Sequence, residues 1–150
     1  MKKMISLLMV ALLLLLCGCG PNANEFRASY LYTGYNSQTQ YPVISVLHSV
    51  DERDACAAQA GSAQVTEALS TYGDKFFQSH VLVVLNIEMG SSAFRYEVEK
   101  VYADGDITTF VLKKTVPGGM FTGDMSGMHI LVEMDESWDC KPENVRIEKQ

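Results

Sequence analysis

The second half of the chain carries the hydrophobic pattern of β-strands. Residues 81–85 (VLVVL) form a continuous apolar run, which is typical of a strand buried on both faces. Over residues 94–99 apolar and charged side chains alternate, which indicates a half-buried strand. Asp104-Gly105 then predicts a hairpin turn. On the return strand we expect Phe110, Leu112 and Val116 on one face and Thr109, Val111 and Lys113 on the other.

Four more strands are predicted from short apolar or β-branched runs. Two lie near the start of the chain, over residues 29–35 and 42–47, separated by a polar turn. The other two follow the hairpin, over residues 128–134 and 145–147. The polar, glycine- and asparagine-containing stretch before the first strand reads as a tether over residues 19–28.

Helical signals are confined to one stretch between these strands. Ser49-Val50-Asp51-Glu52 has the form of a capping box, so a helix is predicted to begin near Val50 and to end at Gly61. A second helix is indicated by apolar residues spaced three or four apart: Val65, Ala68, Leu69 and Tyr72. Residues 74–77 (DKFF) are expected to form a short turn.

These elements predict one α+β domain over residues 29–150. Its main part is a mostly antiparallel β-sheet, closed as a small barrel or stacked as a sandwich, and residues 50–72 add two short helices. About 130 residues remain after the first eighteen, which is enough for a single domain with its own core.

The first twenty residues have the layout of a secretory signal. Lys2 and Lys3 precede an apolar run over residues 4–16, and small residues follow. The run is shorter than the roughly 20 apolar residues of a membrane-spanning helix. Leu16-Cys17-Gly18-Cys19 matches the lipobox of bacterial lipoprotein signals, with a leucine, two small residues and the cysteine that receives lipid.

We therefore expect cleavage between Gly18 and Cys19 and lipid on Cys19. Residues 1–18 are then the signal peptide, and residues 19–28 are a lipidated tether. Several acyl chains on one cysteine hold a protein firmly to a membrane, so the domain is expected at the extracytoplasmic face of the cell membrane. The alternatives are an uncleaved N-terminal anchor and cleavage without lipid.

The charge balance narrows the choice of partners. The whole chain has 12 Lys and Arg against 18 Asp and Glu, a net charge of −6. Loss of residues 1–18 removes only Lys2 and Lys3, which changes −6 to −8. Because nucleic-acid binding depends on neutralising phosphates, this acidic domain is not expected to bind nucleic acid.

Two cysteines, Cys56 and Cys140, remain after the predicted cleavage. An exported domain lies in a compartment where disulfides persist, so a Cys56–Cys140 bridge is one expectation. Two free thiols, one of them buried, are the equal alternative. The sequence shows no CxxC or Cys/His cluster, so no metal site and no cofactor are expected.

The chain has no recognisable catalytic motif. Its three histidines, His48, His80 and His129, border or lie within predicted strands, and none has a second ligand at metal-binding spacing. An acid–base pair of Asp124 and His129 is the alternative to a histidine that only anchors a loop. No G-x-S-x-G, phosphate-binding loop or HExxH is present, and no enzyme activity is expected.

The most unusual stretch of the domain is the glycine-rich loop over residues 118–127. It brings together methionines and a phenylalanine, which form adaptable binding surfaces when exposed. The possible partner surface consists of Met120, Phe121, Met125 and Met128. The alternative is that these side chains fold back onto the core.

The C-terminal half has a distinctive order of segments: the buried strand at 81–84, the Gly90-Ser91-Ser92 turn, the YEVEKV strand at 96–101, Pro117 and the last apolar strand at 130–132. This order resembles the C-terminal domain of the protease-complex-subunit family PrcB. It implies protein–protein contact that stabilises a surface complex.

A second likeness covers most of the mature chain and is to short lipoproteins of Firmicutes. The shared motifs are Tyr41-Pro42-Val43, the S-x-x-E helix start, the YxxxFF segment at 72–77, the Gly-Ser turn and the segment at 122–129 that ends in His129. This chain departs from the pattern with Ala93 in the turn and Met128 before the histidine.

Together the residues and the resemblances predict a non-catalytic, membrane-anchored lipoprotein that binds or stabilises another envelope protein. Two alternatives stay open. One is a small hydrolase that uses the Asp124–His129 loop. The other is a lipoprotein that binds a small ligand in an apolar pocket with few polar groups.

Overall fold

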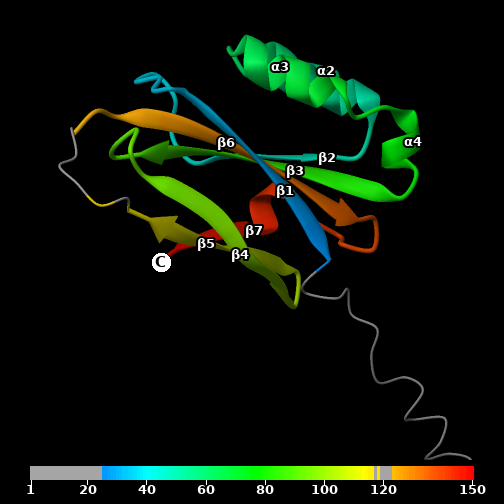
Figure 1. Cartoon of the computed structure of the whole chain (residues 1–150). Coiled ribbons are helices and arrows are strands. Elements are labelled where there is room, and N and C mark those ends of the chain that lie inside the picture. Colours follow the sequence, from blue (N-terminus) through cyan, green and yellow to red (C-terminus); the bar gives the residue numbers. More distant parts are fainter. Residues whose placement is uncertain (1–24, 117, 119–122) are drawn as a thin grey trace, which may run out of the picture.

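The computed structural model describes residues 25–116, 118 and 123–150. These residues form three stacked layers, which Figure 1 shows from the side: a pair of helices, a four-stranded sheet and a three-stranded sheet. The predicted α+β class and the mostly antiparallel pairing are confirmed. In the described part of the chain the two sheets stay open and do not close into a barrel.

The four-stranded sheet has the order β1-β6-β3-β2, and each neighbouring pair is antiparallel. Its strands are Phe26–Gly34 (β1), Val43–Leu47 (β2), His80–Met89 (β3) and Ser126–Asp135 (β6). Strand β1 begins at Phe26, opposite Met134, and so includes three residues that composition assigned to the tether. The side chains of Phe26, Ala28 and Tyr30 pack against the core. This segment therefore belongs to the sheet and not to the tether.

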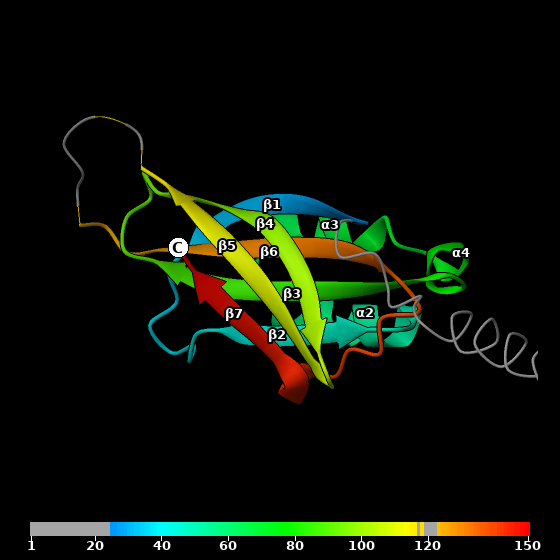
Figure 2. The ribbon, with the colours of Figure 1, turned by 90° about the horizontal axis from the view of Figure 1, so that it is seen from below.

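The three-stranded sheet has the order β4-β5-β7 and lies beneath the first, as both views show (Figures 1 and 2). Strands Arg95–Asp104 (β4) and Ile107–Thr115 (β5) form the predicted hairpin, in which Gly105 has φ +58°. Strand Val145–Lys149 (β7) follows the 3-10 turn Pro142–Asn144 and pairs with β5 in parallel.

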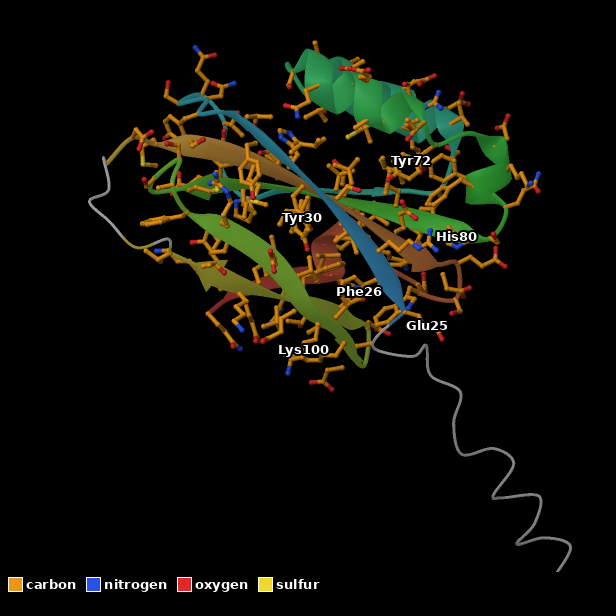
Figure 3. All side chains as sticks on the ribbon, viewed as in Figure 1. Glu25, Phe26, Tyr30, Tyr72, His80 and Lys100 are labelled. Carbon is orange, nitrogen blue, oxygen red and sulfur yellow. The ribbon has the colours of Figure 1, made fainter. Side chains whose placement is uncertain are left out.

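The main core lies between the two sheets. The predicted inward face of the hairpin is confirmed for Tyr96, Val98, Phe110 and Leu112, which are all buried. Val116, predicted to share this face, lies beyond the end of β5 and is exposed. Tyr30 of β1 reaches across the gap, where its hydroxyl accepts a hydrogen bond from the Val98 N–H at 3.0 Å (Figure 3).

Thr109 and Val111 lie on the opposite face, as predicted, and are also buried. Both lie on the central strand of the sheet, where β4 and β7 flank them. Longer side chains of β4 and β7 form a network beside Thr109 and Val111. The Tyr102 hydroxyl donates to Glu148 at 3.1 Å, and the Lys100 ammonium lies 5.2 Å from the centre of the Tyr102 ring.

Helices α2 (Val50–Gln59) and α3 (Ala63–Ser70) cover the other face of the four-stranded sheet. The predicted cap forms, because the Ser49 hydroxyl accepts a hydrogen bond from the Glu52 N–H at 3.2 Å. Val65 and Leu69 of α3 are fully buried against this face. The Tyr72 hydroxyl donates to the Glu133 carboxylate of β6 at 3.0 Å and so ties the helix layer to the sheet.

A third helix, Asp74–Phe77 (α4), occupies the segment predicted as a turn. The two helices predicted from residues 50–72 are confirmed as α2 and α3, and α4 is a third short helix where a turn was expected. One helical turn lets both phenylalanines pack inward: the Phe76 ring lies 4.8 Å from that of Tyr72 and 5.1 Å from that of Phe77. Among the described helices, none is long and apolar enough to cross a membrane.

Candidate functional site

The helix layer covers only part of the four-stranded sheet, and a pocket opens where this cover ends. Beneath the helices the sheet presents aliphatic side chains, such as Leu47, Leu82 and Leu131. The pairing register places Val43, Asn86 and His129 side by side in a row farther along the same face. The sheet surface therefore changes from apolar to polar at the point where the helices stop.

This pocket has a volume of about 660 Å³. Asn86, His129, Ser45 and Thr33 contribute polar groups from four different strands. The connection between α2 and α3 forms one wall, and the segment between β1 and β2 forms another. No Asp, Glu, Lys or Arg occurs among the described residues that line it.

Asn86 has an unsatisfied acceptor in this pocket. Its side-chain oxygen Oδ1 is buried and has no hydrogen-bond partner among the described residues. A buried acceptor without a donor costs about 1–3 kcal/mol of folding free energy. A group that donates to Asn86 from within the pocket would recover this cost, so the residue is suited to binding.

His129 lies beside Asn86 and is only 6% exposed. Its Nδ1 lies 3.3 Å from the Thr33 hydroxyl. Burial lowers the pKa of His129 below its usual value of 6.5, so the imidazole is uncharged at neutral pH. The pocket therefore holds a neutral imidazole that hydrogen-bonds within its own wall.

Tyrosines form the open side of the pocket. Tyr35 and Tyr41 stack on each other with ring centres 5.8 Å apart and planes inclined by 21°. The Tyr41 hydroxyl accepts a hydrogen bond from the Asn36 N–H at 3.2 Å, which orients its ring. Tyr32 also lines the pocket. The pocket thus combines an aromatic rim with a neutral polar interior.

Cys56 lines the same pocket, on its helix side. Burial raises the pKa of its thiol, and a hydrogen bond with Ser45 opposes this shift. Cys140 lies instead in the core between the two sheets, where its thiol is 3.3 Å from the Thr108 hydroxyl. Both cysteines are free, and the disulfide expectation was wrong because the four-stranded sheet separates them.

The alternative acid–base pair is not assembled. The Asp124 carboxylate accepts hydrogen bonds from the Ser91 and Ser92 hydroxyls, at the turn between β3 and β4. His129 lies three residues into β6 from Ser126, which is roughly 10 Å of extended strand. Asp124 therefore fastens the turn, while His129 belongs to the pocket.

The predicted partner surface is only partly tested. Met125 is 43% exposed, as expected of a surface residue. Met128 is fully buried between the sheets, so its assignment to that surface was wrong: residue 128 points to the core face of β6. Met120 and Phe121 lie outside the described residues, as do Gly18 and Cys19 of the predicted cleavage and lipidation site.

Exposed apolar side chains gather at one end of the described domain, here called the distal end. The large hydrophobic side chains exposed by 40% or more are Tyr32, Tyr35, Val43, Val116 and Met125. The pairing of Gly34 and Met89 with Ser126 brings together the segments that carry Tyr32, Tyr35 and Met125. Val43 pairs with Asn86 near the same end of β3, and Val116 follows Thr115, which pairs with Arg95 soon after the end of β3. Phe26 lies at the opposite end of β1 (Figure 3).

Cations stack on aromatic rings at the same end. The Arg95 guanidinium lies 4.4 Å from the centre of the Tyr32 ring. The Lys114 ammonium lies 3.6 Å from the centre of the Phe94 ring. Such contacts hold a positive charge beside an apolar surface. The distal end is therefore apolar and carries two cations on aromatic rings, with the Asp124 carboxylate at the adjoining β3–β4 turn.

Sequence reasoning singled out Met125, which is exposed, but missed the pocket. One residue of the sequence did point to the pocket: Asn86 directly follows the apolar run of β3 and is a polar residue in an otherwise apolar pattern. His48 and His80, by contrast, lie on the surface. Within the described residues no group of three or more His, Cys, Asp or Glu is placed to hold a metal ion.

Comparison with known proteins gives no relative for this fold or site: no protein-family model, no curated protein and no solved structure matches the chain.

Proposed function

We propose that this chain is a lipid-anchored, non-catalytic binding protein of the cell envelope that engages another envelope protein through its distal end. The observation that carries the proposal is the position of the exposed apolar side chains. Those of the described residues gather at the end of the domain that lies opposite Phe26, where the chain enters from the tether.

The geometry suits a protein held at a membrane by its N-terminus. Strand β1 runs for nine residues, or roughly 27 Å, from the tether side of the domain to the distal end. Lipid on Cys19 would hold the Phe26 end nearest the membrane. The distal end then faces outward, where another envelope protein can reach it.

The residue types at the distal end favour protein recognition. Protein interfaces are enriched in tyrosine, methionine and arginine, and all three are exposed or stacked there. The cations Arg95 and Lys114 lie on aromatic rings and favour a partner with acidic groups at the rim of its own apolar surface. The resemblance to the PrcB family supports the same kind of contact.

A hydrolase is less well supported. Asp124 is engaged at the β3–β4 turn, and His129 is buried beside Thr33 in the pocket. A general base has to lie within hydrogen-bonding reach of its partner or of one intervening water. The separation of these two residues favours a binding role.

The test is crosslinked affinity capture of the full chain from its own membranes, with bound proteins identified by mass spectrometry. The native chain is compared with the double variant Val116→Ser, Met125→Ser, because both side chains are exposed at the distal end and their loss removes little from the core. Ile107→Ser, at the β4–β5 hairpin, is an apolar control at the other end of the three-stranded sheet; its side chain is half-buried, so its melting temperature is measured alongside.

We expect one recurrent envelope protein with the native chain and with Ile107→Ser. Its recovery should fall by about tenfold or more with the double variant, while the melting temperature stays within a few degrees. A blank with the native chain, or equal recovery with the double variant, would overturn the proposal.

A further inference from the structure

The pocket beside the helix layer adjoins the distal end and shares Tyr32, Tyr35 and Val43 with it, but its interior is polar. The polar side chains that line it from the sheet are uncharged hydrogen-bonding groups: the Asn86 amide, the His129 imidazole and the hydroxyls of Ser45 and Thr33. Val43 and Val84 lie beside them, and no Asp, Glu, Lys or Arg occurs among the described lining residues. A ligand with a full charge would lose its hydration there and gain no partner of opposite charge.

The unsatisfied oxygen of Asn86 favours a ligand that donates hydrogen bonds. Asn86 Oδ1 is a buried acceptor with no partner among the described residues. A purely apolar ligand would leave this oxygen unsatisfied and would cover the nearby hydroxyls as well. A ligand with several hydroxyl groups can donate to Asn86 and can also accept from the Ser45 and Thr33 hydroxyls.

The tyrosine rim requires an apolar face on the same ligand. Tyr35 is 40% exposed and presents its ring next to the polar interior. The face of an aromatic ring carries partial negative charge and attracts the weakly positive hydrogens of C–H groups. Sugar rings combine such a C–H face with hydroxyl groups around their edge.

We infer that this pocket binds an uncharged saccharide, whose hydroxyls hydrogen-bond to Asn86 and whose ring stacks against Tyr35. The volume of about 660 Å³ lies within the range of small-molecule sites and has room for more than one sugar unit. Tyr35 belongs to both surfaces, but Asn86 lies within the pocket and Val116 and Met125 do not line it, so variants at these three positions test the two proposals separately.

Calorimetric titration of the full chain tests this site. The protein is kept in a polyoxyethylene detergent, because many detergents carry sugar headgroups. The probes are short uncharged oligosaccharides of glucose, galactose and N-acetylglucosamine. An oligosaccharide that contains uronic acid tests the exclusion of charge, and a short peptide with blocked ends tests whether backbone amides serve instead of hydroxyls.

Two variants and one control locate the binding. Asn86→Leu keeps the size of the side chain but removes the unsatisfied oxygen, so affinity should fall by about tenfold or more while the melting temperature does not fall. Tyr35→Ala, at an exposed position, should weaken binding similarly. Tyr102→Ala removes a tyrosine from the outer face of the other sheet and should leave affinity unchanged.

We expect at least one uncharged oligosaccharide to bind and to slow alkylation of Cys56, whose thiol lines the pocket. Three results would overturn the inference: no binding at millimolar concentration, binding that survives both pocket variants, or preference for the charged sugar or the blocked peptide. Capture of a protein partner can succeed or fail independently, because that test changes only Val116 and Met125.

Discussion

Gly127 shows how a single residue shapes the pocket. It lies on β6 opposite Thr33 of β1, on the face that carries His129. A Cβ at this position would lie 2.9 Å from the Gly34 carbonyl oxygen and 2.9 Å from the Thr33 hydroxyl. The absence of a side chain leaves Thr33 the room to approach His129 Nδ1 at 3.3 Å. Glycine is therefore required here for close approach.

Gly127→Ala is expected to lower the free energy of unfolding by about 1–3 kcal/mol, because one of the crowded atoms belongs to the backbone and must shift. Urea unfolding measures the loss. Gly123→Ala is the matched control, since a Cβ there meets no atom of the described residues within 4 Å. Equal losses in the two variants would show that crowding against β1 is not the cause.

At the scale of elements, local sequence determined the ends of helix α2. The Ser49 hydroxyl accepts from the Glu52 N–H, and the Glu52 carboxylate accepts from the His48 N–H at 2.6 Å. Gly61, with φ +62°, follows the end of the helix as predicted. Strand β4 was harder to predict, because the register shifts between Val98 and Lys100. This bulge moves the buried position from residue 100 to Val101, and simple alternation does not anticipate it.

Ser49→Ala is expected to destabilise the protein by about 1 kcal/mol through loss of the cap on α2. Ser62→Ala supplies the comparison: Ser62 is the N-terminal cap residue of α3, but its side chain makes no capping hydrogen bond. Its replacement should cost less. Urea denaturation of both variants gives the difference, and a larger loss for Ser62→Ala would contradict the assignment of the cap.

For the whole molecule, the four-stranded sheet divides two separate environments. On one face, helices and pocket enclose Cys56; on the other, the inter-sheet core encloses Cys140. A disulfide requires Cα atoms within about 7 Å, which two residues on opposite faces of a covered sheet do not reach. The distance between Phe26 and the distal end is also a property of the whole molecule, because it follows from the direction in which whole strands run.

The two thiols should therefore differ in their reactivity toward an alkylating agent. Because both are free, a reducing agent should leave the midpoint of unfolding unchanged. Iodoacetamide is expected to modify Cys56 in the native protein before Cys140, because Cys56 is partly exposed and Cys140 is 2% exposed. Peptide mapping by mass spectrometry resolves the sites. Modification of Cys140 first, or a midpoint that falls on reduction, would contradict this arrangement.

The sequence by itself determined the elements whose signals are local. These are the capping box at Ser49, the continuous apolar run of β3, the Asp104-Gly105 hairpin and the apolar face of α3. Each depends on spacing along a few residues, so the chain carries the information without its folded neighbours. The N-terminal lipoprotein signal belongs to the same class and stays a prediction.

Only the tertiary structure decided which residues meet. Asn86, His129 and Thr33 come from three strands far apart in sequence, and the extent of the helix layer determines which part of their sheet stays open. The strand order also separated Cys56 from Cys140 and turned Met128 into the core. A pocket between layers is a property of long-range packing, and no local spacing encodes it.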